Sequence, residues 1–96
     1  MFDKMKQLME MQKKMQELKR ELDNTDFDIS SPDGVVKITM NGSQEIKEVS
    51  LSEISADKPK LEKAIKEAYN AAIKRAQGIA ADKMKKITGF NLPGLT

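Results

Sequence analysis

Apolar residues recur at different periods along the 96-residue chain, and the change of period divides it into three parts. Up to residue 22 they follow a heptad, broken at Lys4, whose two seam positions are filled by Met1, Leu8, Met15 and Leu22, and by Met11 and Leu18. Three heptads are about the lower limit for a coiled coil. We therefore expect a helix over residues 1–23 that buries much of this seam at a dimer interface, namely Leu8, Met11, Met15, Leu18 and Leu22.

Period-two alternation of apolar and polar residues fills the centre of the chain, residues 26–51. Its apolar positions are Phe27, Ile29, Val36, Ile38 and Met40, followed by a third apolar stretch over 46–51. Two turn signals separate the stretches, a Ser-Pro-Asp-Gly turn at 31–34 and the hairpin signal Asn41-Gly42. The pattern predicts three short antiparallel strands in one small sheet, whose buried face only the helices can cover.

An apolar stripe at intervals of three or four residues follows the sheet and predicts a second long helix over residues 57–88. Asp57 can cap the N-terminus of this helix. Gly78 costs about 1 kcal/mol against Ala within a helix, which leaves a break into two helices open. Residues 89–96 contain Pro and Gly at the end of the chain, a composition that predicts a mobile tail.

Residues 1–96 are predicted to form one α+β domain with the order helix, three-stranded antiparallel sheet, helix. Three strands at about 4.8 Å spacing span only about 10 to 15 Å, whereas the two helices extend for about 32 and 45 Å. Their apolar stripes must continue past the sheet, and a second copy of the chain is the simplest partner. We expect an intertwined or sheet-packed homodimer with projecting helices, and Phe27 and Tyr69 in the core.

The formal net charge of +2 conceals three segments of different sign. Residues 1–20 carry six Lys or Arg against three Asp or Glu, residues 21–57 carry two against nine, and residues 58–96 carry nine against three. The two basic segments are also the two helical ones. Basic helices on either side of an acidic centre indicate a protein that binds a polyanion and keeps it away from the sheet.

The basic residues differ in how far neighbouring acids neutralise them. In the first helix, three cations at heptad spacing each follow an acid by three residues, which is the pattern of a solvated helix with intrahelical ion pairs, and we favour that interpretation there. Lys74 and Arg75 have no acid one turn away, and Lys83 is also expected to be unpaired. The candidate DNA-contacting residues are Lys6, Lys13, Lys14, Arg20, Lys74, Arg75, Lys83, Lys85 and Lys86.

Cys and His are both absent from the sequence. Disulfides, thiolate metal sites and the usual neutral-pH general base therefore have no candidates, so we expect no enzyme, no catalytic or metal-binding residue, no cofactor and no small-molecule substrate. No apolar run approaches the roughly 20 residues of a membrane-spanning helix, so no membrane partner is expected. Aromatic side chains, on which single-strand binders stack bases, are 4% of the chain, which favours duplex DNA.

Five features follow one another along the chain: the basic N-terminal helix, GVVKITMNG at residues 34–42, AYNAA at 68–72, Met84 and LPGL at 92–95. In this order they resemble the YbaB/EbfC family of bacterial nucleoid-associated proteins over essentially the whole chain. The resemblance implies a homodimer of α-β-β-β-α protomers, with helices projecting like tweezers, that binds DNA at the nucleoid in the cytoplasm. The chain departs from the family at Ile38 and Tyr69, where Val and Phe are common, and in lacking a Gly-rich opening.

Two functions remain open at this point. The leading hypothesis is a nucleoid-associated homodimer that binds duplex DNA mainly through phosphates, with low sequence specificity, and that organises the nucleoid or modulates gene expression. Other DNA-processing proteins are further candidate partners. The alternative is a prefoldin-like chaperone or a coiled-coil interaction module, which would hold a protein partner by apolar seams.

Overall fold

The computed structural model describes residues 2–52 and 57–88 as two helices and three strands. In chain order these are α1 (Phe2–Asp23), β1 (Asp26–Ser30), β2 (Val36–Asn41), β3 (Ile46–Leu51) and α2 (Lys58–Thr88). The α+β class and the order helix, three antiparallel strands, helix are confirmed. The tail expected at 89–96 lies outside the described residues, as does the first seam residue, Met1.

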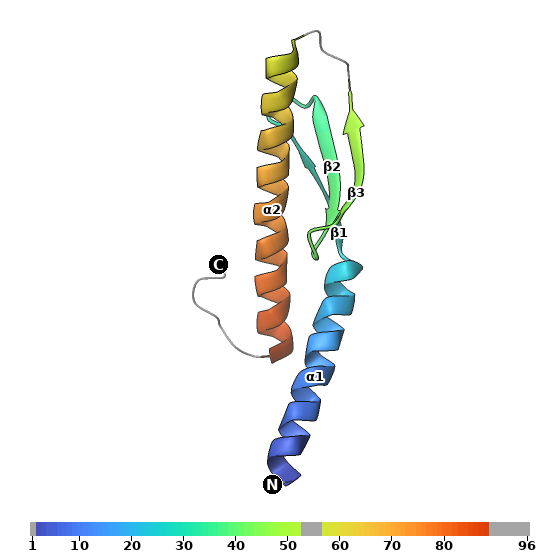
Figure 1. Ribbon diagram of the computed structural model, residues 1–96, viewed down its shortest axis with the longest axis vertical. Coiled ribbons are helices and arrows are strands. Elements are labelled where there is room, and N and C mark those ends of the chain that lie inside the picture. Colours follow the sequence, from blue (N-terminus) through green and yellow to red (C-terminus); the bar gives the residue numbers. More distant parts are fainter. Residues whose placement is uncertain (1, 53–56, 89–96) are drawn as a thin grey trace.

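The sheet has the order β1-β2-β3 with both pairs antiparallel, so β2 is the central strand. Alternation along β2 buries Val36, Ile38 and Met40 on one face, as the sequence pattern predicts. Ile38 lies opposite Ile29 of β1 and Val49 of β3, and cross-strand neighbours share a face of the sheet. All three strands therefore contribute apolar side chains to the side on which α2 packs (Figure 1).

Helix α2 packs on this face through small side chains. Its buried residues are Ala64, Ala68, Ala72 and Ala76. Side chains four residues apart lie on one face of a helix, and alanine lets the helix backbone approach the sheet closely. The helix is continuous through Gly78, so the break considered there does not occur. A Cβ added at Gly78 would have no atom within 4 Å, so packing does not explain this glycine.

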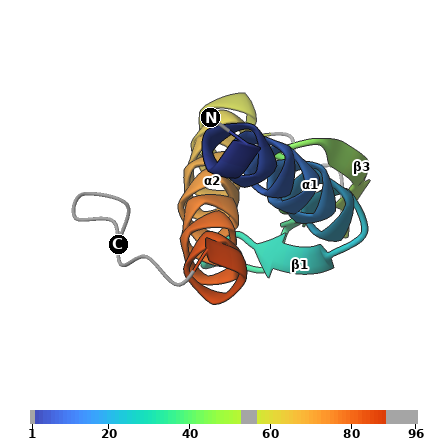
Figure 2. The same cartoon turned by 90° about the horizontal axis from the view of Figure 1, so that it is seen from below.

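Helix α1 projects from one end of the sheet, and its C-terminal half lies beside α2 (Figure 1). Viewed along the long axis, α1 lies in front of the sheet and beside α2 (Figure 2). The molecule is consequently elongated, at 66 × 24 × 16 Å. Leu18 is 6% exposed and packs within the protomer, whereas Leu8, in the projecting half, is 70% exposed. We call the projecting N-terminal half of α1 the arm.

Burial differs from the sequence-based expectation at Tyr69 and along β3. Tyr69 is 44% exposed instead of lying in the core, and every residue of β3 is exposed. The physical reason is the position of α2, which contacts chiefly β2 and β1 and leaves the β3 side of the apolar face uncovered. Phe27, by contrast, is half-buried and packs against the core as expected.

Candidate nucleic-acid interface

Cations gather on the C-terminal half of α2. Among the described residues after position 70, the helix carries five Lys or Arg residues and one acid, Asp82. Lys74 and Lys85 are eleven residues apart, and so are Arg75 and Lys86; all four are exposed. Eleven residues make about three helical turns and about 16.5 Å, so each pair lies in one row along the helix. Two neighbouring rows thus offer four charges to an elongated ligand.

Arg75 is held at the β1 side of α2 by an aromatic contact. Its guanidinium carbon lies 5.8 Å from the centre of the Phe27 ring, within the range of a cation–π interaction. Phe27 is half-buried against the core, so the ring is a fixed platform. Because the contact already restricts the Arg75 side chain, less conformational entropy is lost when its guanidinium binds an anion.

Lys83 faces α1 and differs from the four cations of the two rows. Its Nζ lies 3.5 Å from the Glu21 carboxylate, and the side chain is 27% exposed. The expectation that Lys83 is unpaired is therefore wrong. The two residues are 62 positions apart and meet only where the helices pack, so sequence spacing could not reveal the pair. Lys83 is a weaker candidate for DNA contact than Lys85 or Lys86.

The candidate cations of α1 are exposed and make no ion pair within 4 Å among the described residues. They are Lys6, Lys13, Lys14 and Arg20. Asp3, Glu10 and Glu17 stand three positions before three of them, yet these pairs do not close to ion-pair distance. On α1 the ion pair that forms joins Lys19 and Asp23, four residues apart, at 3.2 Å. The ion pairs expected along this stripe are therefore absent from the described helix, and all four cations remain candidates for DNA contact.

The outer face of the sheet carries the opposite charge. Thr39 in β2 lies between Asp28 of β1 and Glu48 of β3, and its hydroxyl donates to the Asp28 carboxylate at 2.7 Å. Asp26 lies on the same face, two residues before Asp28. Lys37 of β2 shares this face, but the acids outnumber the basic residues, so electrostatics favour the helices over the outer sheet face as the place where a polyanion lies.

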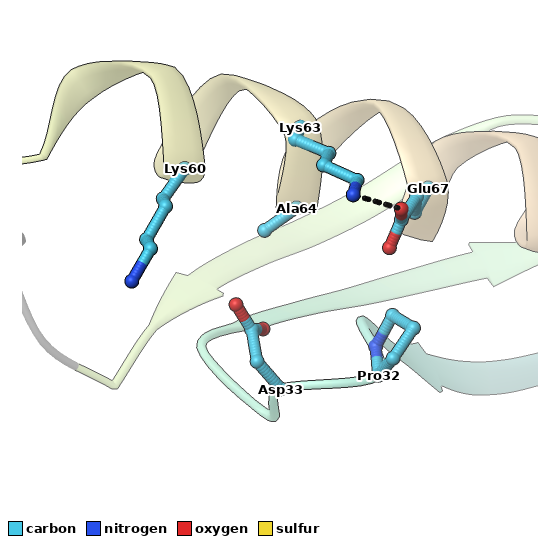
Figure 3. Close-up of a pocket in the computed structure, with 6 residues that line it drawn as sticks. All are labelled: Pro32, Asp33, Lys60, Lys63, Ala64 and Glu67. Carbon is cyan, nitrogen blue, oxygen red and sulfur yellow. Dashed lines mark ion pairs between the residues drawn. The ribbon is translucent and has the colours of Figure 1, made fainter.

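A cavity of about 320 Å³ opens between the first turns of α2 and the β1–β2 turn (Figure 3). Lys63 and Glu67 form an ion pair at 3.9 Å on its wall. The Ser31 hydroxyl and the Val35 N–H donate to Asp33, and these bonds hold the pKa of its carboxyl below the ordinary value of 3.8. Four of the six residues that line the cavity are charged, whereas small-molecule sites are lined mostly by apolar side chains with a few polar groups.

Metal-ligating side chains do not converge in the described part of the chain. No three His, Cys, Asp or Glu residues there lie close enough together to hold a metal ion. Neither of the two helices, over the residues described, is long and apolar enough to cross a membrane.

A second open surface of the protomer is apolar, and we call it the β3–α2 face. Its residues are Ile46, Val49 and Leu51 of β3, and Ile65 and Tyr69 of α2. The strand residues lie opposite buried residues of β2, so they continue the core face beyond the cover of α2. Arg75 marks the β1 side of α2, and Ile65 and Tyr69 lie on the other side of its alanine stripe, towards β3.

The five seam residues expected at a dimer interface divide into two groups. Leu8, Met11 and Met15 are exposed. Leu18 is buried within the protomer, and Leu22 packs against Gly42 of the β2–β3 turn. Sequence reasoning did not identify the β3–α2 face, because apolar alternation in β3 looks the same whether or not a helix covers the strand.

Comparison with known proteins agrees with this fold. The sequence pattern of the YbaB/EbfC DNA-binding family matches residues 1–91. A nucleoid-associated protein of Clostridium acetobutylicum is 34% identical over 94 residues, which cover 94% of this chain and 84% of that protein. The crystal structure of an uncharacterized protein from Helicobacter pylori shares the fold with a TM-score of 0.80 at 20% identity, over 93% of this chain and 98% of that chain. With nearly its whole length matched, the chain belongs to the YbaB/EbfC DNA-binding family.

Proposed function

We propose that this protein is a nucleoid-associated protein that binds duplex DNA as a homodimer, mainly through phosphate contacts and with low sequence specificity. Membership of a DNA-binding family supports DNA as the partner, and the clostridial relative is described as nucleoid-associated. The observation that carries the phosphate mode is the set of exposed cations on α1 and α2 that have no acidic partner within 4 Å in the described residues. The place of action is then the nucleoid in the cytoplasm.

The spacing of the two α2 rows suits a duplex that lies along the helix. Lys74 and Lys85 are about 16.5 Å apart along the axis, as are Arg75 and Lys86. B-DNA repeats about every 34 Å, and its phosphate ridges are separated in turn by the wide major and the narrow minor groove. Two cations about 16.5 Å apart span about half a repeat, so each row can contact phosphates at two places along the duplex. Contacts of this kind position the protein on DNA but do not read bases, which supports low specificity.

A second copy of the chain is the proposed occupant of the β3–α2 face. An exposed apolar patch of this kind is typical of a protein–protein interface. None of its five residues is charged, and a two-fold dimer can bury the same patch on both copies. A protomer of 96 residues with a core built largely from alanine also gains much from further apolar burial. We propose that Leu8 and Met11 of the arm, and Met15 further along α1, meet the second copy as well.

Binding of a fluorescent random-sequence duplex, followed by anisotropy, tests the phosphate contacts. Replacing Lys74 and Lys85 by Ala should weaken binding and reduce the slope of log K against log salt by about 1 for each phosphate that the variant no longer neutralises. The matched control replaces Lys37 and Lys47 of the sheet by Ala, which changes the net charge equally at positions outside the proposed interface. Equal losses of affinity in the two variants would contradict the proposed interface.

A chaperone or coiled-coil interaction module is the second candidate, favoured by apolar side chains exposed on the arm, among them Met5, Leu8 and Met9. Such side chains could hold an unfolded or helical protein partner. If this chain suppresses the aggregation of a model protein and is not retained on duplex DNA, the chaperone or interaction module is supported over the DNA-binding protein. Retention on duplex DNA without suppression of the model protein's aggregation would support the first.

A further inference from the structure

The β2–β3 turn closes over the C-terminal end of α1 through a set of short contacts. The Gly42 N–H donates to the carbonyls of Leu22 and Thr25, both at 3.0 Å. The Asn41 side-chain amide donates to the Asp23 carbonyl at 3.2 Å, and the Ser43 hydroxyl donates to the Asp23 carboxylate. The turn therefore satisfies carbonyls that a helix end otherwise leaves without partners.

Gly42 is required at this turn by close approach and not by backbone conformation. The residue of the turn with a positive φ is Gln44, at 65°. A Cβ at position 42 would lie 2.8 Å from Leu22 Cδ2 and 3.2 Å from both the Cα and the carbonyl oxygen of Leu22. A Cβ there requires the Leu22 side chain to turn aside and the Leu22 backbone to give by a few tenths of an ångström, and the two further methyl groups of Val require more room next to the end of α1.

Asn41 ties the turn together from inside. It is fully buried, and its Oδ1 accepts the N–H groups of Ser43 and Glu45 at 3.0 and 2.9 Å. Its Nδ2 also donates to the Glu45 carboxylate at 2.9 Å, in addition to the bond to Asp23. Because a buried amide with all its partners in place is costly to disturb, the turn is a rigid support.

We propose that residues 41–43 form a clasp that sets the direction of the arm, and thereby positions the cations of α1 for DNA. This inference rests on the proposed function. Lys6 lies 16 residues before Leu22, about 24 Å along the helix, so a rotation of about 10° at the clasp moves it by about 4 Å. Within the described protomer, α1 is otherwise held by its packing on α2 around Leu18 and by the exposed Glu21–Lys83 pair. The clasp is thus a positioning element that need not touch DNA.

Spin-label distances measure the direction of the arm directly, because the chain has no native cysteine. Gln12→Cys on the arm and Asn70→Cys on α2 are exposed positions outside the candidate DNA contacts. Labelled chain is diluted with unlabelled chain so that the distances measured are within one protomer. We expect one narrow distance distribution for the otherwise wild-type chain. Gly42→Val should shift or broaden it, and Gly42→Ala should do so less.

The matched control is Gly34→Ala at the far end of the sheet. Gly34 has a φ of 76°, and a Cβ there meets nothing within 4 Å, so the change strains the fold without touching α1. Gly42→Val should bind a random duplex more weakly than the wild-type chain. Its slope of log K against log salt should be shallower by about 1 for each phosphate that the displaced arm no longer reaches. Gly34→Ala should retain the wild-type slope.

Two outcomes would overturn the clasp. The first is an unchanged distance distribution in Gly42→Val. The second is an equal loss of DNA affinity in Gly34→Ala and in a Gly42 variant, when the two variants have the same melting temperature. If Gly42→Val does not fold, Gly42→Ala carries the same comparison. If the wild-type chain itself does not bind duplex DNA, the proposed function fails, while the distances still decide whether residues 41–43 direct the arm.

Discussion

Replacing Val49 by Asp should turn the proposed homodimer into a folded monomer. Val49 lies in β3 on the apolar side of the sheet, opposite Ile38, and is 54% exposed in the protomer. A carboxylate can therefore be accommodated by the isolated protomer, where water reaches it. In the proposed dimer the same carboxylate lies in the middle of the β3–α2 face, and two-fold symmetry introduces it twice.

The cost of Val49→Asp follows from what is removed and what is introduced. Burying a whole Val side chain contributes about 1.5 to 3 kcal/mol, so burying the exposed half contributes about 1 kcal/mol per copy. An unsatisfied buried polar group costs a further 1 to 3 kcal/mol or more, so the dimer loses about 4 to 8 kcal/mol over its two copies. At about 1.4 kcal/mol per factor of ten, the dissociation constant rises by about three to six orders of magnitude.

Light scattering coupled to size-exclusion chromatography measures the mass at micromolar concentration, and circular dichroism checks that the protomer stays folded. The matched control is Ser50→Asp, the next residue of β3, which points to the outer face and should leave the dimer intact. A dimer that survives Val49→Asp, or that dissociates equally with Ser50→Asp, would refute the assignment of this face. A wild-type chain that is monomeric under these conditions would refute the dimer itself.

Two further predictions concern α1. In the monomeric Val49→Asp background, Leu18→Ala should lower the free energy of unfolding by about 2 to 5 kcal/mol, because Leu18 is buried. Leu8→Ala should change it by less than about 0.5 kcal/mol, because Leu8 is exposed. Equal urea midpoints for the two variants would contradict this prediction. The hydrogen bond from the Ser43 hydroxyl, and then the one from Lys19, lower the pKa of the Asp23 carboxyl below 3.8. The ionised carboxylate therefore contributes its whole stabilisation above pH 3.8, and this contribution is lost as the pH falls through the pKa of the folded state. Ser43→Ala should raise that pKa towards 3.8 in an NMR titration, and an unchanged value would show that the Ser43 bond does not act on Asp23.

The order of elements could be predicted from the sequence because it depends on local periods. Alternation of Val36, Ile38 and Met40 identifies the central strand, and each of these side chains is buried. The same alternation cannot tell which strands a helix will cover. Sequence alone therefore places Tyr69 and the apolar residues of β3 inside, although α2 lies over β1 and β2 and leaves them exposed.

Contacts between distant segments account for the remaining differences. Asn41-Gly42 is a hairpin signal in any sequence, but the need for glycine comes from Leu22, twenty residues earlier, which no local pattern reveals. Lys83 has no acid near it on α2 and finds one on α1. On α1 the reverse is true: acids at three-residue spacing predict ion pairs, and the described helix does not form them. The two rows of cations on α2, by contrast, could have been found from their eleven-residue spacing alone.

The salt dependence of duplex binding tests the phosphate-contact claim most directly. The wild-type chain is titrated against a random duplex and against a single strand of the same length, at salt concentrations from about 50 to 200 mM. If a dimer neutralises about six phosphates, log K for the duplex should fall against log salt with a slope near −5, and the duplex should bind more tightly than the single strand. Duplex binding that does not change over this range, or a preference for the single strand, would contradict the account.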